Sequence, residues 1–496
     1  MILPKGFRIA LSAVVLIFIL FALLPLRHSK HLLTPFLSSH NRDRRLHLLI
    51  VATSSNLNFC RLFLSSSILS YPAPVLIDWE GAGEYNASET HLAKVSGVLR
   101  YLRSLPRSKD DDLILMVDGY DVIFQLGPDV LIKRYFDAIN AANDRLTRQF
   151  GTVQASQNGV RNSILLGPDK QCWPYDLRRL ACYAVPESPL PPKAFGPLTD
   201  DDDAQHARPR WLNSGTIIGP AVDLRKMFEA VVSKINKTFD DEYGLHGSDQ
   251  LYLSDVWGDQ EFMRELNRPG SAGAPKRPDI PPHEEVPGFI LKEENLAVPS
   301  RDSRDLELHM GLDYESRLFQ TVSFYEKYID WITFEQTPVY YESESVSRRA
   351  IRFPEDVRLA SKPFSKIHDY TRLSETEWTD VPLGVNVVTG FAFPVLHFTG
   401  DKSFRDSWWN RMWFYPYAER LLHFGGIDST NRIGDGRIND ANWFKDEPYN
   451  STERLQSSVS AWSDTGKPLG WDELCKVHET LLFQGVDATP NDAIVA

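Results

Sequence analysis

Two carboxylates, Asp118 and Asp121, stand with two residues between them where an apolar run stops, in the sequence Leu-Met-Val-Asp-Gly-Tyr-Asp. Carboxylates at this spacing can converge on one hard divalent cation if the run before them is a strand. The same letters also fit a plain turn, because Asp-Gly is a common turn pair. We favour the metal site, in which the cation would bind a diphosphate and neutralise leaving-group charge.

Two further segments could complete such a site. Asn213-Ser-Gly215 is a run of small residues that lets the backbone approach a ligand closely, although tight turns look the same. His397 ends another apolar run and Lys402 follows it, so the imidazole could be a third metal ligand and the ammonium could bind phosphate. A lone histidine at such a place is more often structural.

Asp249 and Gln250 follow Gly-Ser at the start of a predicted helix. An aspartate at this point is most often an N-cap, whose side chain accepts a hydrogen bond from the first helical turn. The alternative is a carboxylate that faces a ligand. The sequence by itself leaves both interpretations open.

The elements that must position these residues alternate between strand and helix. Short apolar runs predict buried strands at 47–53, 74–78 and 112–118, and helical spacing predicts helices at 59–69 and 92–105. This alternation predicts an α/β fold with a parallel, doubly wound sheet. Ligands in such sheets bind at the carboxyl ends of the strands.

The later part of the chain continues this pattern less regularly. A strand with a turn is predicted at 211–219, and helices at 224–235 and 250–266. Two proline-rich segments, 186–209 and 269–287, predict loops, and the run of four acids in the first is typical of a solvated loop. The formal charge of −12 argues against nucleic acid as a partner.

The N-terminus predicts a membrane anchor. Residues 9–26 carry no charge, and a helix of this length spans about 27 Å, close to one bilayer core. Pro25 and Arg27 stand where a signal peptidase site would be, which favours an anchor over a cleaved signal. Three sequons favour a lumenal body, in a single-pass type II protein of the Golgi or ER membrane. They begin at Asn86, Asn236 and Asn450.

In an oxidising lumen, Cys172 and Cys182 are the natural disulfide pair, with two free buried thiols as the alternative. Cys60 and Cys475 lie far apart in the chain. The sequence does not decide whether they pair.

Nine segments, in this order, resemble the glycosyltransferase domain of the procollagen lysyl hydroxylase/glycosyltransferase family. They are 49–53, 78–81, 91–95, 116–123, 172–174, 212–219, 248–252, 312–320 and 397–402. The resemblance implies a GT-A fold, with a mixed central sheet and helices on both faces, and a UDP-sugar donor. The last segment also looks like the His-x-x-Gly-x-x-Lys motif of glycogenin-like transferases, which favours retention of configuration.

The resemblance implies a metal site of Asp118, Asp121 and His397 for Mn²⁺ or Mg²⁺. It also implies that Tyr120 stacks on uracil and that Thr53 lies near the uridine. The other substrate-binding residues that it implies are Trp79, Lys94, Trp173, Asn213, Ser214, Gly215, Gly400 and Lys402.

In the catalytic role the resemblance places Asp249, beside the transferred sugar, together with Gln250. Three departures from the family pattern bear on sugar choice, on the acceptor and on the phosphate contact. Thr216 replaces a second glycine, the run of acids before Gln250 is reduced to one, and His397 and Lys402 are one residue closer than in the family.

The predicted organisation is a cytoplasmic tail (1–8), an anchor (9–26), a stem (27–45), a GT-A domain (46–410) and a C-terminal extension packed on the core (411–496). None of the 13 histidines is followed two residues later by Asp, the spacing of the iron site in the family's hydroxylase. The predicted function is transfer of a hexose from a UDP-sugar to a glycan or glycoprotein hydroxyl. The alternatives are a catalytically silent, membrane-anchored sugar- or protein-binding module and a nucleotide-sugar hydrolase.

Overall fold

A computed structural model of the chain describes residues 43–81, 91–278, 291–300, 306–343, 346–367, 372–425, 431–447 and 460–484. The predicted tail, the predicted anchor and most of the predicted stem lie outside these residues, as do the sequons at Asn86 and Asn450. Asn236 is described, and it is exposed. The predicted domain boundaries stay predictions.

The predicted location, a single-pass type II protein of the Golgi or ER membrane, is contradicted. Along the described part of the chain, no helix is long and apolar enough to cross a bilayer. The uncharged run 9–26, on which that prediction rests, lies outside the described residues. We therefore assign no membrane location to this protein.

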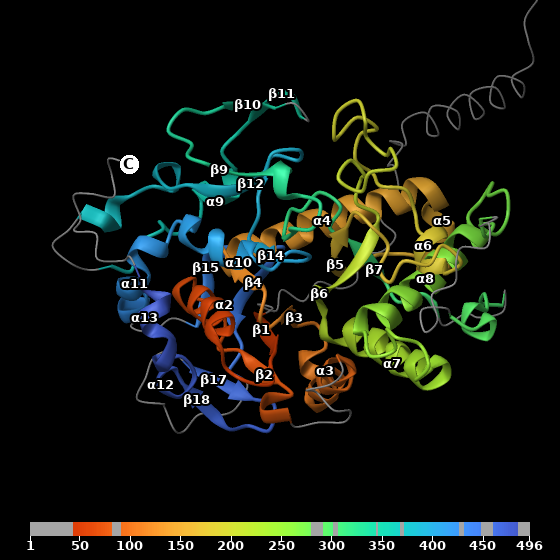
Figure 1. Ribbon diagram of the computed structural model, residues 1–496, viewed down its shortest axis with the longest axis horizontal. Coiled ribbons are helices and arrows are strands. Elements are labelled where there is room, and N and C mark those ends of the chain that lie inside the picture. The colour runs from red at the N-terminus through yellow and green to blue at the C-terminus, as the bar shows by residue number, and fades with distance from the viewer. Residues whose placement is uncertain are drawn as a thin grey trace, which may run out of the picture. The chain divides into compact units, whose positions relative to one another are not determined.

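A large mixed sheet forms the centre of the described chain (Figure 1), and its strand order is β18-β17-β2-β1-β3-β6-β5-β7. β16 also pairs with β1, alongside the first half of that strand, and β15 pairs with β16. The strands are β1 (Asp43–Val51), β2 (Val75–Ile77), β3 (Leu113–Asp118), β5 (Ile164–Asp169), β6 (Trp211–Pro220), β7 (Met310–Leu312), β15 (Arg432–Ile438), β16 (Ala441–Lys445), β17 (Ser460–Ser463) and β18 (Pro468–Gly470).

The prediction of an α/β fold is confirmed, and so is a mixed central sheet with helices. The sheet is parallel along β2, β1 and β3, where the sequence pattern is most regular, and β16, β17 and β7 also pair in parallel with β1, β2 and β5, respectively. β6 then runs antiparallel to both β3 and β5, so the wholly parallel sheet is wrong. The finer GT-A assignment stays a prediction.

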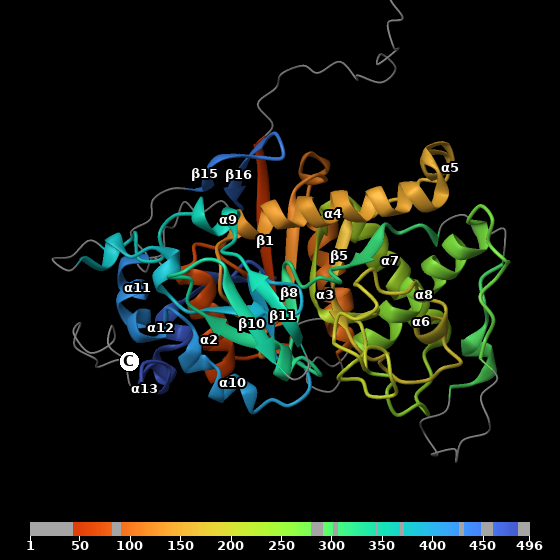
Figure 2. The ribbon, with the colours of Figure 1, turned by 90° about the horizontal axis from the view of Figure 1, so that it is seen from above.

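Alternating residues of the central strands belong to two separate hydrophobic cores. Leu48 of β1 and Leu115 of β3 belong to one hydrophobic cluster, whereas Leu49 and Met116 belong to the other. Because successive strand side chains point to opposite faces, both faces of the sheet are buried. The first cluster includes residues of α2 (Leu57–Ile68) and α4 (Pro128–Phe150), the latter seen along its length in Figure 2. The second includes residues of α3 (Leu92–Ser104), α7 (Ala221–Thr238) and α8 (Asp249–Asn267).

The four predicted helices correspond to α2, α3, α7 and α8, which begin or end a few residues away from the predicted bounds, whereas the longest helix, α4, was not predicted. Helices over the cores and along the remaining chain are α2 (Leu57–Ile68), α3 (Leu92–Ser104), α4 (Pro128–Phe150), α5 (Thr152–Gln157), α6 (Leu180–Tyr183), α7 (Ala221–Thr238), α8 (Asp249–Asn267), α9 (Glu355–Arg358), α10 (Phe404–Ser407), α11 (Ala418–Gly425), α12 (Trp471–Leu474) and α13 (Glu479–Leu482).

Three smaller sheets complete the described strands. The first consists of β4 (Val122–Phe124), β14 (Val395–His397) and β8 (Phe319–Thr321), and it pairs His397 with Val122, next to Asp121. This pairing joins segments some 270 residues apart in the chain. The other two sheets are β9 (Ile329–Ile332) with β12 (Leu383–Asn386) and β13 (Phe391–Ala392), and β10 (Val339–Ser343) with β11 (Val346–Ile351).

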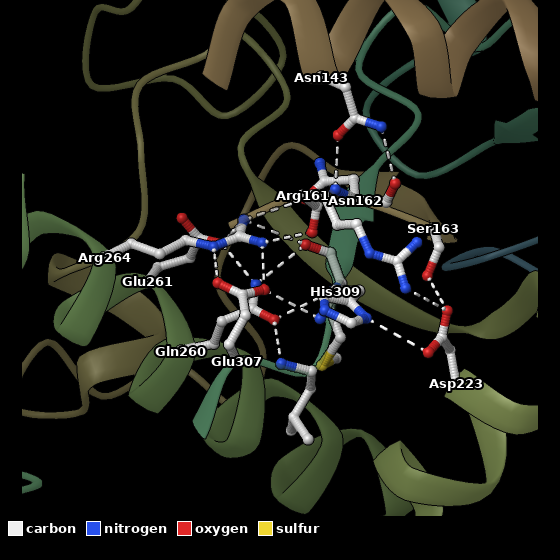
Figure 3. A network of polar contacts seen from close by, with 12 residues as sticks. Asn143, Arg161, Asn162, Ser163, Asp223, Gln260, Glu261, Arg264, Glu307 and His309 are labelled. Atoms are coloured by element: carbon white, nitrogen blue, oxygen red, sulfur yellow. Dashed lines mark hydrogen bonds and ion pairs between the residues drawn. The ribbon is translucent and has the colours of Figure 1, made fainter. Parts of the chain in front are cut away.

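A buried polar network holds the C-terminal half of helix α8 to the beginnings of strands β5 and β7 (Figure 3). Arg264 of α8 contacts Glu307 at 2.6 Å and donates to the Asn162 side chain at 3.0 Å. The side-chain amide of Gln260, in the same helix, donates to the Met310 carbonyl and accepts from the Met310 N–H, in β7. α8 is thereby held to β7 and to the start of β5, so that its first residue, Asp249, keeps a fixed place at the other end.

The four cysteines form two disulfides. Cys172 pairs with Cys182, as predicted. Cys60 pairs with Cys475, which the sequence left undecided, and joins α2 to the end of α12 across 415 residues.

A buried histidine links β1 to β3 and to the C-terminal strands. His47 lies 3.2 Å from Asp112 and 3.0 Å from Asp446, and its Nδ1 is 2.8 Å from the Tyr101 hydroxyl. Lys109 also contacts Asp446, at 2.7 Å. Burial alone would lower the pKa of His47, but the hydrogen bonds and charges of Asp112 and Asp446 raise it above its ordinary value.

This raised pKa predicts a pH-dependent part of the stability. The protonated form is favoured by folding, so its contribution is complete below about pH 6.5 and is lost as the pH rises through the raised folded-state pKa. We expect His47→Gln to lower the free energy of unfolding by about 3 kcal/mol at pH 6. The difference from the wild type should shrink as the pH rises, in denaturant unfolding measured from pH 5 to 9. The exposed His423 supplies the control, His423→Gln, which should follow the wild-type curve. A gap that is constant with pH would contradict this account.

Candidate functional site

A pocket of about 730 Å³ lies where β3, β5 and helix α8 bring their polar ends together. Asp118 ends β3, Asp169 ends β5, and Asp249 begins α8. Most of the predicted site residues line this pocket. They are Asp118, Asp121, Trp173, Asn213, Ser214, Gly215, Asp249, Gln250, His397, Gly400 and Lys402.

Asp118, Asp121 and His397 form the one group of potential metal ligands found along the described residues. One ligand atom of each lies within 4.8 Å of the others. His397 Nε2 is 3.4 Å from Asp121 Oδ1 and 3.9 Å from Asp118 Oδ2. Adjacent ligands of an octahedral Mg²⁺ lie about 3 Å apart, so a small inward movement would suffice.

The state of Asp121 also fits a cation. Its Oδ1 is buried, and no described residue donates a hydrogen bond to it. Burial alone would raise the pKa of Asp121, but the charges of His397 and Lys402 and the hydrogen bond from Lys402 to Oδ2 hold it below its ordinary range. The carboxylate is thus ionised and has an oxygen to offer, which is what a hard cation requires.

Lys402 makes an ion pair with Asp121 Oδ2 and donates to the backbone carbonyl of Phe398 at 2.6 Å. The ammonium therefore lies on a predicted metal ligand and is part of the pocket wall. A phosphate contact by Lys402, as the resemblance implies, would require its side chain to leave this carboxylate.

Lys94 does not line the pocket but connects two of its acids from behind. Its buried ammonium is 2.7 Å from Asp118 and 2.8 Å from Asp249, and it donates to the Ser214 carbonyl at 3.0 Å. Burial alone would lower the pKa of Lys94, but the two carboxylates raise it, and the lysine in turn holds the pKa of Asp249 below its ordinary value. Ser248 precedes the helix as its cap residue, so the N-cap interpretation of Asp249 is wrong.

Gln250 and Asn213 organise the floor of the pocket. Gln250 donates to the Leu212 carbonyl at 3.0 Å, and Asn213 donates to Asp169 at 3.0 Å. Burial raises the pKa of Asp169 to about 6, although the hydrogen bonds from Asn213 and Gln250 oppose the shift. An acid with such a pKa can gain or lose a proton near neutral pH.

Tyr120 and Thr53 lie together, although neither lines the pocket. The Tyr120 hydroxyl accepts from the backbone N–H of Thr53 at 2.9 Å and from that of Ser54 at 3.0 Å. Trp79 is buried against Phe59, with ring centroids 5.7 Å apart, and also lies outside the pocket lining. These bonds hold the Tyr120 hydroxyl just beyond the carboxyl end of β1, and in the chain Tyr120 lies between Asp118 and Asp121.

Trp173 lines the pocket yet is 50% exposed. Its loop is held by the Cys172–Cys182 disulfide and by Arg179, which donates to the Pro174 carbonyl at 2.6 Å. The indole is thus presented on a fixed support at the mouth of the pocket.

Several residues of the pocket wall were not among the predicted site residues, and Asp169, His91 and Phe324 are examples. Asp169 carries the same signal as Asp118, an acid at the end of an apolar run, and could have been found by it. His91 lies 3.8 Å from Asp249, and Phe324 has a φ of 63°, which a residue with a side chain rarely adopts. His91 lies in segment 91–95 of the resemblance but was given no role there, and Phe324 carries no signal in the sequence.

No family model matches the chain. "Procollagen-lysine,2-oxoglutarate 5-dioxygenase 1" of Gallus gallus is 24% identical over 231 residues, which are 46% of this chain and 24% of that protein. "Multifunctional procollagen lysine hydroxylase and glycosyltransferase" of Caenorhabditis elegans is 25% identical over 227 residues, 45% of this chain and 24% of that protein. The match spans about a quarter of the length of these relatives. The chain is thus distantly similar to enzymes of the procollagen lysyl hydroxylase/glycosyltransferase family.

Gly215 tests the convergence of the three ligands. A Cβ on this residue would lie 2.1 Å from His397 Cε1 and 2.6 Å from Asp118 Oδ2, so Gly215→Ala must push the two side chains apart. We expect this variant to bind Mn²⁺ at least about tenfold more weakly than the wild type in calorimetric titration. Gly436→Ala is the matched control, because its Cβ would meet nothing within 4 Å. Equal Mn²⁺ affinity of Gly215→Ala and the wild type would show that these ligands do not share an ion.

Proposed function

We propose that this protein is a metal-dependent glycosyltransferase that moves a hexose from a UDP-sugar to a hydroxyl of a glycan or glycoprotein acceptor. The observation that carries the proposal is the convergence of Asp118, Asp121 and His397 within 4.8 Å, in a pocket that Asp249 also lines. One of the two distant relatives is named as a multifunctional lysine hydroxylase and glycosyltransferase, which supports the same reaction class.

Asp118, Asp121 and His397 would hold Mn²⁺ or Mg²⁺, which supplies Lewis-acid stabilisation of a diphosphate leaving group. In the transfer, the bond between the anomeric carbon and the phosphate oxygen breaks and UDP departs with the electron pair. The acceptor oxygen then bonds to the anomeric carbon, and its proton passes to the departing diphosphate.

The charged side chains of the pocket have the signs needed to stabilise the charges that develop at the two ends of the breaking bond. Lys402 would offset the negative charge that develops on the diphosphate, and Asp249 would stabilise the positive charge at the anomeric carbon. Lys94 would keep Asp249 ionised and oriented for this role. We propose retention of configuration, on the likeness of segment 397–402 to glycogenin-like transferases.

A second candidate is a catalytically silent sugar- or protein-binding module. One observation favours it: the Lys402 ammonium already lies on Asp121, a carboxylate that the metal would need. The shortened distance between His397 and Lys402 in the sequence points the same way. In such a module the lysine would take the place of the cation permanently.

Release of UDP separates these candidates. With a panel of UDP-sugars and Mn²⁺, we expect the wild type to release UDP from one donor, and Asp121→Asn to lower the rate at least about a hundredfold, because a metal ligand is lost. Asp201→Asn is the control, since Asp201 lies exposed in the loop 200–203, away from the pocket lining.

Metal-independent release, or equal rates in Asp121→Asn, would contradict the metal-dependent transfer. A folded wild type that turns over no UDP-sugar would favour the silent module. Turnover that no acceptor stimulates would indicate a hydrolase instead.

A further inference from the structure

The segment 460–484 lies against the part of the sheet that carries Thr53 and Trp79. Its strand β17 pairs in parallel with β2, and Figure 1 shows β17, β18 and α12 beside β2 and α2. Trp471 stacks on Phe63 of α2, with ring centroids 5.8 Å apart. From this position the segment makes two separate contacts with the loops at the carboxyl ends of β1 and β2.

The first contact is made by Asp464, at the end of β17. Its carboxylate accepts from the backbone N–H of Asp78 at 3.2 Å and from Arg100 at 2.7 Å. Asp78 and Glu80 both have a φ of 60°, a costly conformation for residues with side chains, so the turn needs support from its neighbours. The Glu80 N–H donates to the Thr53 carbonyl at 2.9 Å, and this bond passes the restraint on to the loop after β1.

The second contact reaches the other end of that loop. The Ser55 hydroxyl donates to the carbonyl of Leu474, the last residue of α12. The next residue, Cys475, is bonded to Cys60 of α2, with a Cα–Cα distance of 5.6 Å. A covalent bond therefore fixes the acceptor of the Ser55 hydrogen bond relative to the helix that follows the loop.

Between these two contacts lies the pair of N–H groups, on Thr53 and Ser54, that donate to the Tyr120 hydroxyl. Tyr120 is adjacent in the chain to the potential metal ligand Asp121. We propose that Asp464 and the Cys60–Cys475 disulfide are positioning elements: they fix the loop 53–55, and through it the Tyr120 ring, for the nucleoside of the donor. The proposal rests on the proposed function, because the nucleoside is the uridine of that donor.

The proposal is tested on the whole chain by breaking the disulfide, in the double variant Cys60→Ser with Cys475→Ser. Hydrogen exchange of the Thr53 and Ser54 amides, without ligand, should be at least about fivefold faster than in the wild type. The dissociation constant of UDP in the presence of Mn²⁺ should rise about five- to tenfold, because the free protein no longer holds Tyr120 in place. The Mn²⁺ affinity should stay within about twofold, a split that general destabilisation would not give. Cys172→Ser with Cys182→Ser is the matched control, which should leave amide exchange in the 53–55 loop unchanged.

A double-mutant cycle assigns the effect to the tyrosine. In a Tyr120→Phe background, which lacks the hydroxyl, loss of the disulfide should weaken UDP binding by less than about twofold further. If the disulfide variant does not fold, Ser55→Ala, which removes the hydrogen bond to the Leu474 carbonyl, is measured in its place.

Unchanged amide exchange, or an unchanged UDP affinity in a protein that binds UDP, would overturn the proposal. Additive effects in the cycle would also overturn it. A wild type that binds no UDP would instead contradict the proposed function, and faster amide exchange in the variant would then still show that the disulfide positions the loop.

Discussion

Four carboxylates meet in one pocket, and the need to compensate their charge is the constraint on which the rest of the site depends. They are Asp118, Asp121, Asp169 and Asp249. Acids this close cannot all stay ionised unless cations lie beside them. The Lys94 ammonium of α3 pairs with both Asp118 and Asp249, and the Lys402 ammonium pairs with Asp121. Asp169 is bonded to neutral amides instead, and burial raises its pKa. Asp118 and Asp121 are therefore suited to a divalent cation, and Asp169 to exchange of a proton.

The fold brings Lys94 and His397 to this site from segments that are far apart in the chain. α3 lies on one face of the central sheet, whereas His397 arrives in the small sheet through β14. The network around Arg264 fixes the far end of α8, and Gly215 leaves room for His397 beside Asp118. The C-terminal segment is also distant in the chain. Its strand β17 pairs with β2, and Leu474 of its helix α12 accepts a hydrogen bond from Ser55, in the loop that contacts Tyr120. The pocket is therefore built from the whole described chain rather than from one motif.

The sequence predicted the elements whose signal is local. Apolar runs that stop at an acid placed β3 and Asp118 correctly, and the helical spacing of 92–105 placed α3. Strand direction is not contained in such periodicity, so the antiparallel course of β6 could not be predicted. Neither could the pairing of Cys60 with Cys475, which requires the C-terminal strands to be in place. Asp169 could have been predicted as a site residue, because it ends an apolar run as Asp118 does. The contacts of Lys94 with Asp118 and Asp249 depend on tertiary packing alone.

The central claim is that Asp118, Asp121 and His397 share one divalent cation. A crystal structure of the protein with Mn²⁺ and UDP tests it most directly, through the anomalous scattering of manganese. We predict one manganese peak within about 2–2.5 Å of an oxygen of each aspartate and of His397 Nε2, with the Lys402 ammonium moved off Asp121. A structure with UDP bound but with no manganese among these three side chains, and with Lys402 still on Asp121, would contradict the account.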